Sequence, residues 1–134
     1  FLGSIVCFGL IEAQQSNNLS PWAVMLVLSY PFTDLIFSVL RRRFITGGDT
    51  MQPDAEHLHH VVYQRFETLK FRHDRVRHFC TIFFLTIFNF PYIASAVYFA
   101  NNTLALMSIF IAYIVSYLLI YFSLNPRFLL RNEG

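Results

Sequence analysis

Charged side chains are scarce in this chain. Only 13% of its 134 residues are Asp, Glu, Lys or Arg, whereas a typical soluble domain has about 25%. Apolar residues make up 55% of the chain and the mean hydropathy is +0.47. The apolar residues gather in runs close to the ~20 residues needed to cross ~30 Å of hydrocarbon. We therefore expect an integral membrane protein rather than a soluble domain.

Cysteine is also scarce, and the two residues present carry no functional pattern. Cys7 and Cys80 both lie inside apolar runs, where a packed thiol is favoured over a disulfide or a metal site. The sequence also lacks an initiator Met and a signal-peptide n-region, and it begins at Phe1 inside an apolar run. We expect a fragment, the C-terminal part of a larger multi-span protein.

The apolar runs predict an all-α fold, a polytopic transmembrane helix bundle with one membrane domain over 1–134. The first run is too short to span a bilayer on its own. Ser20 is the expected N-cap of the second, with Pro21 at its first position, and Pro31 should kink it. The expected helices lie at about 1–12, 21–40, 79–100 and 103–124.

The last two predicted helices are joined by Asn101 and Asn102 alone, a link too tight for anything but an antiparallel hairpin. Asn89 and Pro91 interrupt the first of this pair. Both residues are tolerated in a membrane where neighbouring helices satisfy the freed polar groups.

Basic residues are absent from the links at 12–20 and 101–102, whereas the 41–78 loop has eight and the tail has Arg127 and Arg131. By the positive-inside rule, the loop and the C-terminus should face the cytoplasm. We expect a multi-pass protein of the bacterial inner membrane.

The 41–78 loop also holds all five histidines and five of the eight carboxylates. Asp54 could cap a helix in this loop. Such a helix is amphipathic, and we expect it to lie flat on the cytoplasmic interface. Its apolar face is predicted to consist of Leu58, Val61, Val62, Phe66 and Leu69.

Three imidazoles stand close together in His57-Leu58-His59-His60. On a helix His57 and His60 share a face, whereas on an extended segment His57 and His59 align. A transition-metal site is disfavoured because the i, i+4 partner of His57 is Val61. Interfacial side chains without a partner stay open as an alternative. We favour a cluster of hydrogen-bond donors for phosphate, because imidazole titrates near neutrality and donates from either nitrogen.

Asp34 is the second candidate site residue. It lies seven residues before Arg41, hence roughly 10 Å below the cytoplasmic end of its helix, where a carboxylate is costly and usually functional. It could simply pair with Arg41 or Arg42 reaching back from the interface. The favoured alternative is a role in orienting a basic residue or a hydrated cation at the floor of an active site.

Arg41, Arg42 and Arg43 end the predicted span, an ordinary positive-inside feature by themselves. Combined with the acidic helix and the histidines, they predict a pocket for a multiply charged phosphate at the bilayer surface. Arg65 is expected to face water or lipid headgroups from the loop helix.

The order Asp34, Arg41-Arg42, a Gly-containing link and Pro53-Asp54-x-x-His57-x-His59-His60 resembles the bacterial polyprenyl-phosphate N-acetylhexosamine-1-phosphate transferases. The resemblance is to the branch that moves GlcNAc-1-phosphate from UDP-GlcNAc to undecaprenyl phosphate. It covers about residues 1–65 in order, and the last two spans by hydropathy only. Ala55 stands where the family commonly has Arg, which removes one phosphate contact or points to a different sugar.

The resemblance implies that His57, His59 and His60, with Asp34, are catalytic. Substrate-binding residues implied in the same way are Arg41, Arg42, Arg43, Asp54 and Arg65. It also implies Mg²⁺ as cofactor, held by aspartates that precede Phe1, so this fragment should be inactive alone.

The implied partners are a UDP-sugar, a polyprenyl phosphate lipid and the membrane, with no nucleic acid; assembly as a homodimer is left open. The implied reaction releases UMP and makes a lipid-linked precursor of cell wall, O-antigen or exopolysaccharide. The alternative from another class is a non-catalytic membrane protein whose basic, His-rich loop binds anionic lipid headgroups.

Overall fold

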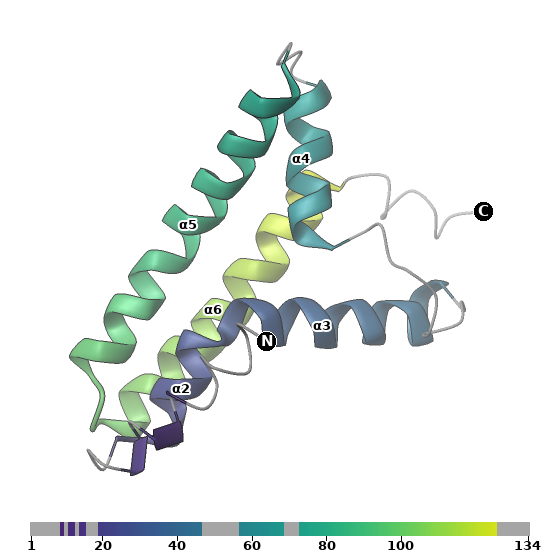
Figure 1. Cartoon of the computed structure of the whole chain (residues 1–134). Helices are drawn as coiled ribbons and strands as arrows, with labels where there is room; N and C mark the ends of the chain where they lie inside the picture. Colours follow the sequence, from purple (N-terminus) through teal and green to yellow (C-terminus); the bar gives the residue numbers. More distant parts are fainter. Residues whose placement is uncertain are drawn as a thin grey trace.

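The computed structural model describes residues 9, 11–12, 14–15, 19–46, 57–68 and 73–125. These residues form helices and no strand, which confirms the all-α class. Most of the helix expected at 1–12 lies outside the described residues, as do Asp54, Ala55, Arg127 and Arg131. The helices, in chain order, are α2 Pro21–Val27, α3 Ser29–Arg41, the π-helical turn η1 Arg42–Thr46, α4 Leu58–Thr68, α5 Asp74–Tyr98 and α6 Thr103–Leu124 (Figure 1).

The two long helices α5 and α6 form the expected antiparallel hairpin (Figure 1). Each is long and apolar enough to cross a membrane, and the bent pair of α2 and α3 makes a third span if it is counted as one. The turn between α5 and α6 is closed by Asn102, whose side chain accepts from the Ala105 N–H over 3.1 Å and whose own N–H donates to the Phe99 carbonyl over 2.8 Å. Asn102 thereby caps α6 and reverses the chain.

The sequence predicted that this helix begins at residue 79, but α5 begins at Asp74. The Asp74 carboxylate stands in the first turn, where the helix dipole favours a negative charge. The His73 carbonyl accepts from the N–H groups of Val76 and Arg77. Pro91 does not interrupt the helix, and Asn89 is satisfied as expected, because it donates to the Leu85 carbonyl and accepts from a hydroxyl of α6.

The predicted span 21–40 is broken into two helices that meet at an angle of 74°. Ser20 caps α2 and Pro21 opens it, as predicted. The break falls at Leu28, three residues before Pro31. Proline has no N–H, so the Val27 carbonyl loses its i+4 donor and the ladder stops there. The predicted kink is confirmed, but it turns the chain far more sharply than a curved span would.

Helix α2 packs against both α5 and α6 near their shared turn (Figure 1). Ala23 on α2 and Ala96 on α5 are 6% and 2% exposed. Small side chains of this kind let two helix backbones approach closely, which is the main source of packing energy between helices in lipid. The cluster is completed by Leu26, Leu106 and Phe110.

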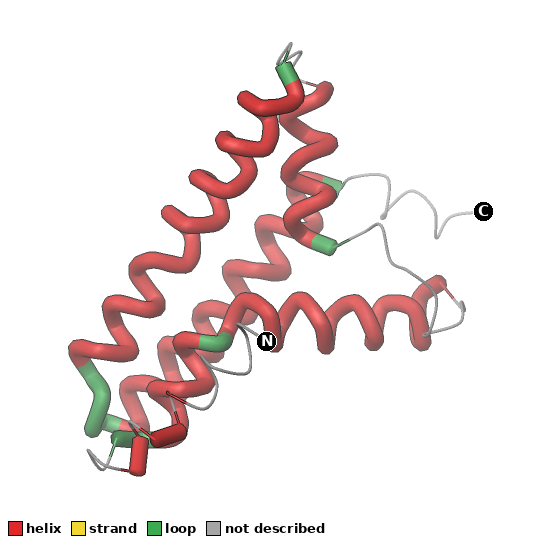
Figure 2. Tube along the Cα trace, viewed as in Figure 1, coloured by secondary structure: helices red, strands yellow, loops and turns green. Residues whose placement is uncertain are grey.

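Helix α4 fills the wedge where α5 and α6 diverge away from their turn (Figure 2). Leu58, Val61 and Val62 of α4 are buried against Tyr113, Tyr117 and Tyr121 of α6. Phe66 of the predicted apolar face packs against the same cluster, and Leu69 lies outside the described residues. The expected position of this face on the lipid interface is wrong, because protein covers it. The loop predicted at 41–78 is likewise largely helical where it is described.

Candidate functional site

The face that α3 turns toward the rest of the molecule is polar, and the face it exposes is apolar. Among the exposed residues, Leu35 is 61% and Leu40 is 48% exposed. Such an inverted pattern suits a helix whose outer side meets lipid and whose inner side lines a polar site. The buried residues of α3 are Ser29, Thr33, Asp34, Ser38 and Arg41.

Asp34 is the centre of this polar face. It is 7% exposed, and three donors from two other elements meet its carboxylate. Oδ1 accepts from the Tyr117 hydroxyl over 2.6 Å and from the Leu58 backbone N–H over 3.0 Å. Oδ2 accepts from His57 Nδ1 over 2.8 Å. Both oxygens of this buried carboxylate are therefore satisfied by hydrogen bonds.

Asp34 also caps a helix to which it does not belong. The Leu58 N–H is the first amide of α4, and the first amides of a helix have no partner within it. A negative charge at that end is favoured by the helix dipole as well. Asp34 on α3 therefore fixes the N-terminus of α4 against α3 and α6.

His57 occupies the bend just before α4, where its carbonyl accepts from the N–H groups of His60 and Val61. The carboxylate of Asp34 can only accept, so Nδ1 of His57 carries the hydrogen in this contact. The Ser38 hydroxyl lies 3.1 Å from the same nitrogen. The Nε2 nitrogen is thus left to accept when the ring is neutral and to donate when it is protonated.

The three imidazoles form a row in which His59 lies between the other two. The rings of His57 and His59 are nearly parallel, at 13° with centroids 5.8 Å apart, and those of His59 and His60 are 4.2 Å apart. The alignment of His57 with His59 follows from the bend at His57, and the helical pairing of His57 with His60 does not apply. The cluster brings together three of the predicted site residues and anchors them on a fourth, Asp34.

Burial lowers the pKa of His59 below its ordinary value, and its neighbours His60 and His57 lower that pKa further, against the opposing effect of Asp34. Burial removes water from the charged ring, and a second positive charge is unfavourable beside the other imidazoles. His59 is therefore neutral at pH 7.

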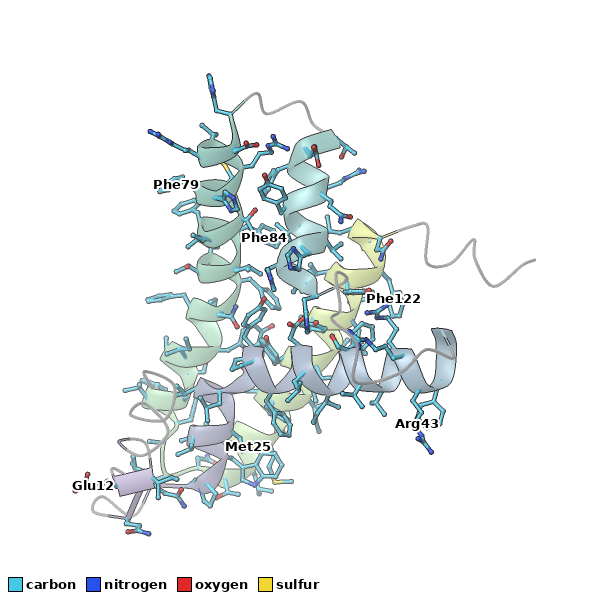
Figure 3. All side chains as sticks on the ribbon, turned by 45° about the vertical axis from the view of Figure 1, so that its right-hand side comes forward. Glu12, Met25, Arg43, Phe79, Phe84 and Phe122 are labelled. Carbon is cyan, nitrogen blue, oxygen red and sulfur yellow. The ribbon has the colours of Figure 1, made fainter. Side chains whose placement is uncertain are left out.

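The arginines predicted as substrate-binding residues separate into different positions. Arg41 is 3% exposed and lies two helical turns beyond Asp34 on the same face of α3. Arg42 is half-buried, and Arg43 is exposed and points away from the bundle at the far end of α3 (Figure 3). Arg65 is exposed on α4, where it lines a separate hollow of about 510 Å³ with Leu124 at the end of α6. Of these, Arg41 fits the candidate site best.

The sequence interpretation missed the contribution of α6. Tyr117 binds Asp34, and its neighbours on the same face, Tyr113 and Tyr121, are also fully buried. Their i, i+4 spacing in an apolar helix was a usable signal, because each buried hydroxyl needs a hydrogen-bond partner. Ser38, one turn after Asp34, could have been found in the same way.

The described residues do not fit a Mg²⁺ site. Mg²⁺ prefers several oxygen ligands, whereas Asp34 is the one carboxylate of the cluster and its oxygens are already engaged by three donors. Within the described parts of the chain, no group of three or more His, Cys, Asp or Glu side chains is arranged to hold a metal ion. The Mg²⁺ predicted to bind elsewhere stays a prediction.

An apolar groove of about 390 Å³ runs between α5 and the α2–α3 bend. Tyr30 lines this groove and lies one helical turn before Asp34, so the groove approaches the polar face of α3. Its other lining residues are Val27, Ile82, Leu85, Thr86, Asn89, Phe90 and Ile93.

Comparison of the chain with protein-family models, with curated proteins and with solved structures found no match.

Proposed function

We propose that this chain is part of a phospho-glycosyl transferase that moves a sugar-1-phosphate from a UDP-N-acetylhexosamine to a polyprenyl phosphate and releases UMP. The reaction supplies a lipid-linked precursor for a cell wall, O-antigen or exopolysaccharide. The enzyme belongs in the bacterial inner membrane, with the histidine cluster and the C-terminus in the cytoplasm.

The observation that carries the proposal is the contact between His57 Nδ1 and Asp34 Oδ2 at 2.8 Å. A carboxylate behind the imidazole stabilises the protonated ring, and a protonated ring is a good donor to a phosphate oxygen. The same contact fixes the orientation of the ring before substrate arrives. Fixed donors of this kind are effective in catalysis because they need no rearrangement during the reaction.

The surroundings of this pair suit a substrate with a charged and an apolar end. The imidazole stack and Arg41 supply cationic or hydrogen-bonding groups, whereas the groove beside Tyr30 is almost entirely apolar. A polyprenyl phosphate has both characters. Its phosphate would be held near His57 and its chain would follow the apolar side of α5.

In the proposed reaction an oxygen of the polyprenyl phosphate attacks the β-phosphorus of the UDP-sugar. A new P–O bond forms, the bond from the β-phosphorus to the bridging oxygen breaks, and that oxygen leaves with UMP. Charge spreads over the phosphate oxygens in the transition state. His57 and His60 would donate hydrogen bonds to these oxygens, neutral His59 would separate the two rings, and Arg41 would attract the diphosphate.

The alternative, a non-catalytic loop that binds anionic headgroups, is less well supported. An amphipathic helix that binds a membrane surface inserts its apolar face into lipid. The apolar face of α4 is instead covered, with Leu58 at 0% and Val62 at 2% exposure. The basic side chains could still attract lipid, but the helix would not insert.

The test is an assay of the complete protein in detergent with undecaprenyl phosphate, a panel of UDP-N-acetylhexosamines and Mg²⁺. We expect UMP release from one of them. His57→Ala or His60→Ala should abolish it without changing membrane insertion, and Arg41→Ala should mainly raise the KM for the UDP-sugar. His78→Ala, which removes an exposed histidine of α5, is the matched control.

Absence of UMP release with every UDP-sugar would overturn the proposal. Salt-sensitive binding to anionic vesicles by such an inactive protein would then favour the headgroup-binding alternative.

A further inference from the structure

Tyr117 of α6 is a fully buried residue of the candidate site. It is 0% exposed, and the ring of Phe37 meets its ring edge-on at 70° with centroids 5.8 Å apart. Its hydroxyl donates to Asp34 Oδ1 over 2.6 Å, across 83 residues of sequence. A buried, fixed ring holds its hydroxyl oxygen in one position, so this contact constrains the orientation of the carboxylate.

The two oxygens of the Asp34 carboxylate accept from different donors. Oδ1 receives Tyr117 and the Leu58 N–H, and Oδ2 receives His57. With Oδ1 held from two sides, Asp34 cannot rotate, and Oδ2 stays directed at the imidazole. The strength with which Oδ2 attracts a protonated His57 also depends on how much of the negative charge is already stabilised at Oδ1.

We infer that Tyr117 is a positioning residue that acts through Asp34 to fix the orientation and the protonation of His57. Its role in turnover rests on the proposed function, whereas its effect on the protonation of His57 does not. Tyr117 does not itself reach the phosphates. It sets the pH range over which His57 can donate a proton.

The sign of the effect follows from the charge on the carboxylate. Tyr117→Phe removes one donor from Asp34, so more negative charge remains to attract protonated His57. The ring should then keep its proton to a higher pH. A more acidic phenol, such as 3-fluorotyrosine at position 117, donates more strongly and should have the opposite effect.

Other titratable groups on the surrounding elements act on His57 equally in wild type and variant. They therefore set the absolute titration midpoint but not the difference on which the test depends. Besides Asp34 and Tyr117, these groups are Tyr30 and Arg41 on the same face of α3 and His59 and His60 on α4.

The experiment is an NMR titration of histidine-labelled complete protein in detergent, with the His57 signal assigned by its loss in His57→Gln. In Tyr117→Phe we expect the His57 midpoint to rise by about half a pH unit or more, since a hydrogen bond to a charged group exceeds that energy. Tyr113→Phe is the matched control. It removes an equally buried hydroxyl from the same face, one that donates to Asn89 instead, and its midpoint should equal that of wild type.

The pH profile of UMP release gives the second readout. In Tyr117→Phe its limbs should move to higher pH and kcat should fall about tenfold, with the KM for the UDP-sugar nearly unchanged, as expected for a group absent from substrate. An unshifted His57 midpoint in Tyr117→Phe overturns the inference. If that variant does not fold, 3-fluorotyrosine at position 117 decides, because an unshifted or raised midpoint there also overturns it. A shifted midpoint in a protein that releases no UMP supports the inference and refutes the proposed function.

Discussion

Asp34 and His57, 23 residues apart in sequence, are joined by a 2.8 Å contact between the carboxylate and Nδ1. The contact links the buried polar face of α3 to the residue just before α4, in a segment that the charge pattern alone would leave at the bilayer surface. One carboxylate thereby performs two functions. It caps α4 through Leu58, and it orients the imidazole that begins the histidine stack.

Replacing Asp34 by Asn should reveal both functions. The amide oxygen can serve Tyr117 or Leu58, but the NH₂ group meets Nδ1–H of His57 donor against donor. We expect UMP release to fall at least about 100-fold, comparable to losing a major electrostatic contribution to catalysis, and unfolding to become easier by about 3 kcal/mol, as for a broken buried pair. Thermal unfolding in detergent and the UMP assay measure the two effects.

Asp74→Asn is the control, because that carboxylate lies exposed at the start of α5. It should leave turnover unchanged and stability nearly so. Turnover of Asp34→Asn within a few-fold of wild type would show that the carboxylate is structural only.

The residue types of the site were predictable, but their pairing was not. A carboxylate inside an apolar helix and three clustered imidazoles are both unusual enough to be noticed in sequence. Whether Asp34 meets a histidine, an arginine or an amide depends on how α3, α4 and α6 pack. The i, i+4 spacing of three tyrosines on α6 indicates a face that needs hydrogen-bond partners, but it does not indicate which element covers that face.

The fold was predictable where one local cause decides it. Asn102 and Ser20 cap helices through their own side chains, and Pro31 removes its own hydrogen bond, so the turn, the start of α2 and the break in span 21–40 follow from the sequence. The position of α4 does not. An amphipathic helix can bury its apolar face in lipid or in protein with similar gain, and the choice depends on the wedge that α5 and α6 leave open.

Leu58→Ala tests whether α4 depends on this wedge. Leu58 is 0% exposed and packs within the tyrosine cluster of α6. Truncation should cost about 2–5 kcal/mol, the range for a buried leucine that leaves a cavity. The loss should appear as a lower unfolding temperature and as faster hydrogen exchange of α4 amides.

Gln64→Ala is the control on the same helix, since Gln64 is exposed. It should leave both measurements nearly unchanged. If α4 were bound to lipid rather than to protein, the Leu58→Ala effect would disappear when the detergent is exchanged for one with a different chain length, whereas a protein contact would keep it.

The lowered pKa of His59 predicts how stability depends on pH. In the unfolded chain this histidine titrates near its ordinary ~6.5, so between that value and the lower folded value the unfolded state binds the extra proton. Stability should therefore be greatest above pH ~6.5 and fall as the pH drops through the folded pKa. Unfolding temperatures of wild type should decrease from pH 7.5 to 5, and His59→Gln should reduce that decrease.

His78→Gln is the control, and it should keep the pH dependence of the wild type. An NMR titration provides the direct check: the His59 midpoint must lie below the ordinary histidine value. A midpoint at or above that value would show that the stack does not exclude charge from His59.

Arg77 of α5 forms an ion pair near the C-terminal end of α4, so its removal should destabilise that end of α4 alone. Its guanidinium pairs with Glu67 of α4 at 3.0 Å and with Asp74 of its own helix, and it lies 5.3 Å from the centre of the Tyr63 ring. Both carboxylates are exposed, so the pairs are weak and screened by salt. Arg77→Ala should therefore lower the unfolding temperature slightly at low salt and not at all at high salt.

Turnover should be preserved, because Asp34 still fixes the N-terminus of α4. A large loss of turnover in Arg77→Ala would instead mean that His57 depends on both ends of α4 being held, and that Asp34 alone is insufficient to position it.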